Sequence, residues 1–309
     1  MAPITHGYRR IPVLQIRNDV YCDTQAILDE LERRYPEPSL YPARRGSSKP
    51  DYALYDITSQ WVQQTLFRAS WSQMPWDPTP NEMKASPLAA TFGDQSFVSD
   101  RNAISKASPA KMRQLKPLLQ DQFISGLDTI EAQLRPLQHE KEFGFFLETA
   151  TPSMVDINVY FNMWYLIMTR AVPEIITMEA YPGILTWFKR MQGFIKSQKH
   201  RELDAVPITP EQALEVARQA TAAGETTPAI RADRGIHLIH PAERLKVGDW
   251  VAVSPNDYMK DPMQGRIVGL STRQIAIQPE SLVQYPDVRV TIHFPRHGYF
   301  VKPVLKASL

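Results

Sequence analysis

Asp23 and Thr24 stand side by side where a β-prone segment gives way to an amphipathic one, and they carry the clearest candidate chemistry in the sequence. Both side chains offer oxygen acceptors, so either residue can cap the helix predicted over 25–34. The free N–H groups at such a helix start also attract a carboxylate. Capping and ligand binding are compatible, and both interpretations stay open for this pair.

Two short strands are predicted to position this pair. Residues 11–16 form an apolar run that begins with Ile11-Pro12, and proline belongs at a strand entrance or edge because it lacks an N–H. Turn-forming residues follow at 17–19, where Asn18 is expected to adopt the left-handed conformation. Residues 20–22 are β-prone again. The sequence therefore predicts a strand, a tight turn, a second strand and a capped helix.

This order of residues, IPVL, a turn, VYC and DT, resembles the second half of the thioredoxin-like domain of cytosolic glutathione transferases. The resemblance implies a cis bond between Ile11 and Pro12, with the neighbouring backbone pairing with the cysteinyl part of glutathione. It also implies that Thr24 donates to the γ-glutamyl carboxylate and that Asp23 receives the ammonium group. A trans proline on an edge strand is the alternative for Pro12.

The same family places a strand-helix-strand unit, with the catalytic Ser, Tyr or Cys, before this proline. Such a unit needs roughly 30 residues, and only residues 1–10 precede Ile11. The catalytic residue is therefore expected upstream of Met1, because the start was assigned too late. The alternative is that the protein lacks the catalytic half. The 309-residue form is expected to have little transferase activity.

The expected fold class is multidomain α+β. Residues 1–50 read as a partial thioredoxin-like segment, 51–205 as an all-α domain of the glutathione transferase C-terminal type, and 206–234 as a helix and linker. Residues 235–309 change to a period of two, which predicts a small β-barrel that folds independently. The KVGDWV opening at 246–251 resembles SH3-like barrels.

The all-α segment carries a second recognisable signal. Ser153 can cap a helix that contains Ile157 to Met168, and Asp156 can reach back to complete a capping box. This resembles the start of the buried core helix of the transferase helical domain. A long helix is predicted after Ser108-Pro109, and Pro117 is expected to end or kink one of its turns.

The β segment contains five predicted strands, near residues 250–253, 265–270, 274–278, 288–294 and 299–304. The whole arrangement is similar to fungal glutathione-transferase-like proteins that carry a C-terminal β extension, many of them encoded in secondary-metabolite gene clusters.

Composition narrows the function classes. The chain is 43% hydrophobic and 22% charged, which excludes a disordered protein, and its net charge of +2 does not favour nucleic acid or an acidic membrane surface. A single cysteine and the lack of a long apolar run indicate a cytoplasmic protein. Cys22 is expected to be buried and unreactive, because the adjacent Asp23 raises a thiol pKa.

Two further residue sets have structural interpretations. Four histidines have spacings seen in zinc sites, but no cysteine accompanies them, so we expect surface or edge histidines and no metal. They are His237, His240, His293 and His297.

Core packing is expected for most of the aromatic set Trp61, Trp71, Trp76, Tyr160, Trp164 and Trp187. The family resemblance makes Trp61, Phe67 and Trp71 candidates to line the site of a hydrophobic co-substrate.

The resemblance thus implies a transferase-like protein whose full-length form uses glutathione as co-substrate to conjugate or otherwise modify a small electrophilic metabolite. The expected partners are glutathione and a hydrophobic electrophile, with a possible homodimer and neither nucleic acid nor membrane. The alternative is a non-catalytic interaction scaffold or ligand carrier that lacks the catalytic half of the thioredoxin domain.

Overall fold

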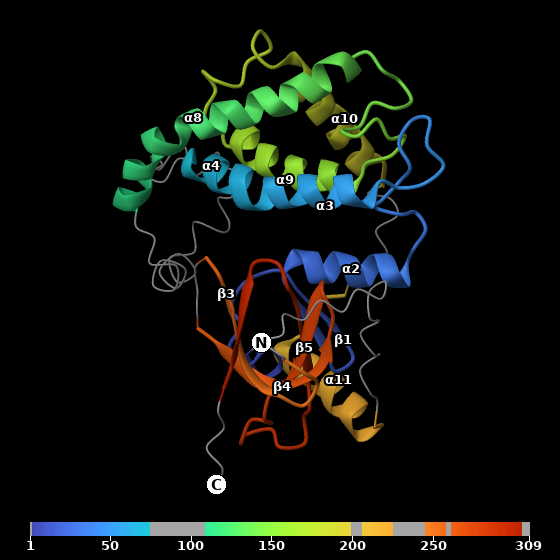
Figure 1. The fold of residues 1–309 in the computed structure, drawn as a ribbon, viewed down its shortest axis with the longest axis vertical. Helices are drawn as coiled ribbons and strands as arrows, with labels where there is room; N and C mark the ends of the chain where they lie inside the picture. The colour runs from blue at the N-terminus through green and yellow to red at the C-terminus, as the bar shows by residue number, and fades with distance from the viewer. Residues whose placement is uncertain (1, 75–108, 199–205, 225–244, 258–260, 305–309) are drawn as a thin grey trace. The chain divides into compact units, whose positions relative to one another are not determined.

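The structure is a computed structural model that describes residues 2–74, 109–198, 206–224, 245–257 and 261–304. Contacts group the chain into two units, one made of residues 1–36 with 205–309 and the other of residues 37–204 (Figure 1). This grouping differs from the four consecutive segments expected from the sequence, because both ends of the chain belong to one unit. None of the described helices is long and apolar enough to cross a membrane.

The first unit is built on one sheet of seven strands in the order β1-β2-β6-β5-β4-β3-β7. Its elements are α1 (Ala2–Thr5), β1 (Val13–Ile16), β2 (Asp19–Cys22), α2 (Thr24–Arg34), α11 (Pro210–Ala222), β3 (Trp250–Pro255), β4 (Met263–Leu270), β5 (Gln274–Gln278), β6 (Thr291–Pro295) and β7 (Tyr299–Pro303). All neighbouring strands run antiparallel except β2 and β6, which run parallel. The sheet is therefore mixed.

The predicted hairpin between β1 and β2 is confirmed, with Val13 opposite Cys22 and Ile16 opposite Asp19. The turn differs from expectation in one detail, since Arg17 rather than Asn18 has the left-handed conformation, with φ 58°. Asn18 is buried, and its carbonyl accepts a hydrogen bond from the Thr291 N–H at 2.9 Å. Because the Asn18 backbone is already paired with β6, Arg17 is the residue that adopts the left-handed conformation of the turn.

The expected SH3-like barrel is wrong, because the sheet is not closed. Strand β6 pairs with β5 along one edge and with β2 along the other, while β7 pairs with β3. A strand has only two edges, so β6 has no edge left for closing the five C-terminal strands on themselves. The N-terminal hairpin instead extends those strands into the open sheet.

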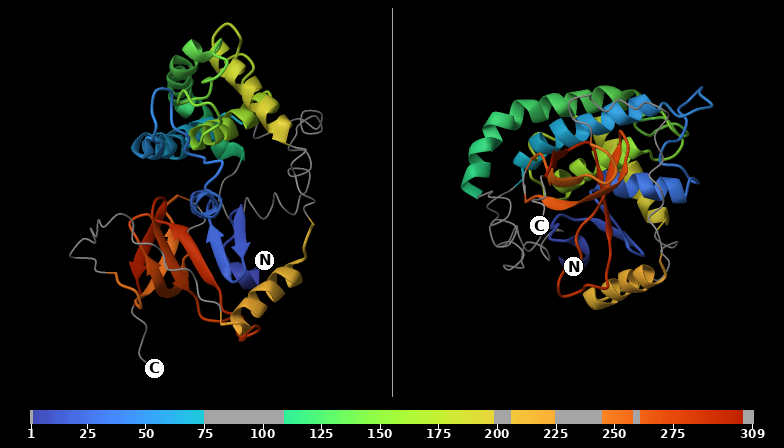
Figure 2. Two further views of the ribbon diagram at one scale, coloured as in Figure 1. Left: turned by 90° about the vertical axis from the view of Figure 1, so that its right-hand side faces the viewer. Right: turned by 60° about the horizontal axis from the view of Figure 1, so that its bottom comes forward.

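The core of this unit joins residues from both ends of the chain. Val20 and Cys22 on β2 pack in one buried cluster with Ala217 on α11 and with residues of the C-terminal strands, including Ile292 and Phe294. Because side chains alternate along a strand, Tyr21 faces the opposite side, towards α2. Helices α2 and α11 accordingly cover the two faces of the β1–β2 hairpin (Figure 2).

All regular elements in the described residues of the second unit are helical, as predicted. Its elements are α3 (Tyr52–Trp61), the π-helical segment η1 (Val62–Leu66), α4 (Phe67–Ser72), α8 (Pro109–Leu134), the 3₁₀ turn η2 (Arg135–Leu137), α9 (Met154–Met168) and α10 (Pro182–Gln198). Elements α3, η1 and α4 follow one another without a break (Figure 1). Helix α8 continues through Pro117, so this proline does not end the helix, and the alternative expectation of a kink at this turn stays a prediction.

A fully buried carboxylate organises the helical unit. Asp156 is the third residue of α9, and its Oδ2 accepts from the Ser153 N–H at 2.9 Å and from the Ser153 hydroxyl at 2.6 Å. Its Oδ1 accepts from the Phe146 N–H at 2.8 Å and from the Trp187 indole N–H at 2.7 Å. The predicted capping box at Ser153 is confirmed. The carboxylate also ties α10 and the loop before α9 to this helix start.

Replacing Asp156 by alanine is expected to lower the free energy of unfolding by roughly 3 kcal/mol or more, because several buried donors lose their acceptor at once. Chemical denaturation followed by circular dichroism measures this change. The control is Asp121→Ala, since Asp121 is exposed on α8 and surface substitutions usually stay within about 0.5 kcal/mol. Similar stabilities of the two variants would contradict the role given to the Asp156 network.

Candidate functional site

The predicted pair Asp23 and Thr24 lies at the junction of β2 and α2. Asp23 is the N-cap residue of α2, and its Oδ1 accepts a hydrogen bond from the Gln25 N–H at 3.0 Å. The capping interpretation is therefore confirmed for Asp23. Thr24 is exposed and Asp23 is half-buried, so the pair is partly accessible. The first turn of α2 contains no acidic residue, so Asp23 is the acidic group at the positive end of this helix.

The backbone at Asp23 is strained. Its φ of 79° and ψ of 141° lie in a region that residues other than glycine rarely occupy. Such conformations typically cost 1–3 kcal/mol and cluster at ligand-binding and catalytic positions. The strain sets Asp23 apart from Ser153 and Thr209, which cap α9 and α11 from ordinary extended conformations.

Side chains from both ends of the chain surround the Asp23 carboxylate. The Tyr299 hydroxyl, on β7, donates to Asp23 Oδ2 at 3.3 Å. The Tyr8 hydroxyl lies 2.8 Å from the Tyr299 hydroxyl, and Arg10 forms an ion pair with Asp257. Sequence reasoning did not identify Tyr8, Arg10, Tyr299 or Asp257. No local pattern could have identified them, because Tyr299 reaches Asp23 across 276 residues.

The electrostatics of this cluster centre on Asp23. Burial raises the pKa of the Asp23 carboxyl, while the Gln25 N–H, the nearby Arg10 and the Tyr299 hydroxyl oppose the rise. Burial and the charge of Asp23 raise the pKa of the Tyr299 hydroxyl, so that tyrosine stays a neutral donor. Burial also raises the pKa of Tyr8. The Asp23 side chain is thus held by a backbone N–H and a phenol.

Ile11 and Pro12 lie just before β1. Their peptide bond is cis, as predicted, and both residues are exposed. Ile11 is 70% exposed, which is unusual for an isoleucine. All four residues proposed to contact glutathione, namely Ile11, Pro12, Asp23 and Thr24, therefore belong to the first unit. No thiol-activating residue can be assigned among the described residues.

The histidine interpretation needs one correction. His293 is neither a surface nor an edge histidine, since it is only 2% exposed on β6. Its Nε2 lies 2.8 Å from Asp19 Oδ1, and its ring stacks on Tyr21 at a centroid distance of 4.3 Å. Parallel pairing of β2 with β6 creates this environment, which the local sequence does not reveal. Within the described residues no cluster of His, Cys, Asp and Glu could hold a metal, and His237 and His240 lie outside them.

The aromatic set divides into core and surface residues. Trp187 is buried and bonds Asp156, whereas Trp61, Trp71, Tyr160 and Trp164 are half-buried. Trp76 lies outside the described residues. Core packing is therefore confirmed for Trp187, and Tyr160 packs beside it by stacking on Phe188 at a centroid distance of 5.0 Å. The other described members of the set are partly exposed.

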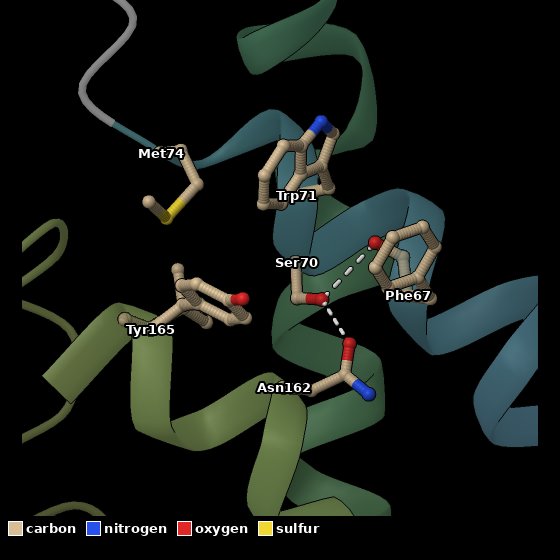
Figure 3. A pocket seen from close by; sticks show the side chains of 7 residues that line it. Phe67, Ser70, Trp71, Met74, Asn162 and Tyr165 are labelled. Atoms are coloured by element: carbon tan, nitrogen blue, oxygen red, sulfur yellow. Dashed lines mark hydrogen bonds between the residues drawn. The ribbon is translucent and has the colours of Figure 1, made fainter. Parts of the chain in front are cut away.

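A small pocket in the helical unit brings Trp71 together with the rings of Phe67 and Tyr165 (Figure 3). It is lined by Phe67, Ser70, Trp71 and Met74 from α4 and its end, and by Asn162, Tyr165 and Leu166 from α9. Its volume of about 10 Å³ holds roughly one water molecule. The Ser70 hydroxyl donates to Asn162 Oδ1 at 2.7 Å, so a polar pair is fixed at the pocket wall.

Local backbone irregularity marks this pocket as well. The π-helical segment η1 directly precedes Phe67, and π-helical turns inside α-helices occur frequently at functional sites. Trp71 packs edge-on against Tyr165 at 5.8 Å, and Phe67 stacks on Trp71 at 5.9 Å. These rings present flat apolar surfaces, which suit an aromatic or otherwise planar small molecule.

Comparison with known proteins identifies the fold. The family model "Glutathione S-transferase, N-terminal domain" matches residues 1–39, and a model for a domain of unknown function, DUF7962, matches residues 84–200. A solved GST-like protein from Pseudomonas syringae aligns over 98% of this chain and 84% of its own, with 23% identity and a TM-score of 0.63. The fold is glutathione-S-transferase-like.

Two further solved structures are more distant. The β-etherase LigF from Sphingobium sp. strain SYK-6 is 18% identical over 62% of this chain and 79% of its own, with a TM-score of 0.44. A glutathione S-transferase from Rhodospirillum rubrum F11 is 15% identical over 67% and 77%, with a TM-score of 0.37. Both scores are too low to support an argument about this protein. No curated protein matches the chain.

The transferase-like fold contains a cysteine that is unsuited to nucleophilic chemistry. Burial, and then the negative charge of Asp23, raise the pKa of the Cys22 thiol. The thiolate is the reactive form, so Cys22 is expected to react with iodoacetamide at pH 8 at least tenfold more slowly in the folded protein than in urea. Mass spectrometry of the alkylated protein measures both rates. Equal rates would show that the thiol is accessible in the folded state.

Proposed function

We propose that the protein binds glutathione through the first unit and uses it to conjugate, or otherwise modify, a small electrophilic metabolite. The observation that carries this proposal is the accessible pair Asp23 and Thr24 at the strained start of α2. Thr24 and the helix N-terminus would bind the γ-glutamyl carboxylate, and Asp23 would receive the adjacent ammonium group. The transferase-like fold supports the choice of glutathione as the ligand.

The residues Ile11 and Pro12 would contact the remainder of the tripeptide, with the Ile11 backbone pairing with its cysteinyl part. The reaction itself needs a group that stabilises the glutathione thiolate, and interactions that bind only the ground state do not accelerate chemistry. A reducing cytoplasm, in which glutathione is a thiol, fits this proposal. A homodimer and a role in fungal secondary metabolism are further parts of the hypothesis that sequence resemblance suggests.

Glutathione binding is expected to depend on both members of the pair. Asp23→Asn retains an acceptor for the Gln25 N–H but removes the charge, and should weaken binding by roughly 10- to 100-fold, as expected for a hydrogen bond to a charged group. Thr24→Ala should weaken it about threefold to tenfold. Isothermal titration calorimetry with reduced glutathione measures these affinities.

The matched control is Thr129→Ala, which removes the same hydroxyl from an exposed position on α8 and should leave the affinity unchanged. An assay with a dinitrophenyl halide as electrophile then separates binding from catalysis. Turnover that falls with Asp23→Asn supports the enzyme, and binding without turnover supports a carrier. Unchanged affinities in both Asp23→Asn and Thr24→Ala would rule out this site.

The aromatic pocket of the second unit favours a ligand carrier as the second candidate. Met74 lies in the pocket wall, and because methionine side chains are flexible, its movement can enlarge a space that now holds about one water molecule. A planar ligand would then stack against Trp71 and Tyr165.

Trp71→Ala is expected to weaken binding of a planar apolar probe, such as a naphthalene sulfonate, by about tenfold through lost ring contacts. Trp61→Ala is the control, because Trp61 is also half-buried on the preceding helix but does not line the pocket. Fluorescence titration of the probe measures both affinities. Equal losses in the two variants would place the probe elsewhere.

A further inference from the structure

The C-terminal β region supplies a side chain to the proposed ligand site. Tyr299 is only 8% exposed, and its ring packs against Phe294 at a centroid distance of 5.3 Å. This packing fixes the ring, and its hydroxyl donates to Asp23 Oδ2. The Tyr299 hydroxyl thus bonds a residue that is both strained and partly accessible.

The two oxygens of Asp23 are held separately. Oδ1 accepts from the Gln25 N–H, and Oδ2 accepts from the Tyr299 hydroxyl. A carboxylate has about four acceptor positions, so further positions remain for a ligand. The Tyr8 hydroxyl can donate to the Tyr299 oxygen once the Tyr299 proton is directed to Asp23. The two bonds on Asp23 therefore fix the orientation of its carboxylate before a ligand arrives.

The charges around Asp23 favour a cationic group. The ionisable side chains that face it are Tyr8, Arg10, Cys22, Asp257 and Tyr299. The phenols and the thiol are neutral, and Arg10 is paired with Asp257. When Asp23 is ionised, the cluster carries one net negative charge, which an ammonium group offsets and a second carboxylate does not.

We propose that Tyr299 is a positioning residue, which holds Asp23 in the orientation that receives the ammonium group of glutathione. The inference rests on the proposed function, and it gives the C-terminal β region a direct part in ligand recognition. The rival explanation is that the hydroxyl merely satisfies the hydrogen-bonding need of a buried tyrosine. The two explanations differ in their predictions for ligands with and without the ammonium group: only the positioning role predicts that loss of the Tyr299 hydroxyl weakens binding of the former more than of the latter.

The experiment compares Tyr299→Phe with Tyr8→Phe in the full chain. Both variants lose one phenolic hydroxyl and keep the ring, but only Tyr299→Phe removes the donor to Asp23. Calorimetry is performed with glutathione and with glutaryl-cysteinylglycine, which lacks only the α-amino group. Melting temperatures show that both variants fold.

Tyr299→Phe should weaken glutathione binding by about tenfold and binding of the glutaryl analogue by less than about twofold. Tyr8→Phe should weaken glutathione binding by less than about threefold. In an Asp23→Asn background, Tyr299→Phe should have no further effect, because the two residues act through one interaction. Equal losses for the two ligands, or additive losses in the double variant, would overturn the positioning role.

A titration without ligand separates this inference from the proposed function. Carbon NMR of the Asp23 carboxyl should show a higher pKa in Tyr299→Phe, since the donor that stabilises the charged form is gone. Glutathione binding should then be lost at a higher pH than in the unsubstituted protein. An unchanged Asp23 titration would overturn the role of Tyr299. Failure of the unsubstituted protein to bind glutathione would instead overturn the proposed function.

Discussion

The parallel pairing of β2 with β6 is the constraint on which the first unit depends. It aligns Asp19 with Thr291 and Tyr21 with His293, and the buried contact between His293 and Asp19 helps to fix that register. A slip by one residue would reverse the faces of Val20 and Cys22 and remove them from the core shared with α11. The pairing also occupies the edge of β6 that a closed barrel would need. The two ends of the chain consequently fold as one unit.

The candidate site at α2 is a consequence of this pairing. Asp23 follows β2 directly, and Tyr299 lies on β7, which follows β6 after a short turn. Bringing β6 beside β2 therefore brings the Tyr8–Tyr299 pair to the Asp23 carboxylate. In this way a strained N-cap residue gains a buried donor from a distant segment. A region that could be regarded as an appendage becomes part of the proposed recognition site.

The helical unit depends on a different interaction, the buried Asp156 carboxylate. Its four hydrogen bonds join the start of α9 to the preceding loop and to Trp187 on α10. Because the penalty for an unsatisfied buried donor is high, this network specifies one arrangement of these segments. It leaves the other face of α9 free to present Phe161 and Tyr165 beside Trp71. A rigid helix start thereby supports an adaptable aromatic pocket.

The sequence by itself determined those features that depend only on residues close together in the chain. Spacing, residue type or a family pattern predicted the β1–β2 hairpin, the cap at Asp23, the capping box at Ser153 and the burial of Cys22, and the structure agrees with each. It also agrees with the helical character expected of 51–205 wherever it describes those residues. Only the tertiary structure decided which strand edges meet. The backbone N–H and C=O groups at a strand edge are alike in every strand. No residue pattern therefore predicted that β6 would pair with β2. The open sheet, the burial of His293 and the contact of Tyr299 with Asp23 all follow from that choice, and sequence reasoning missed each of them for this physical reason.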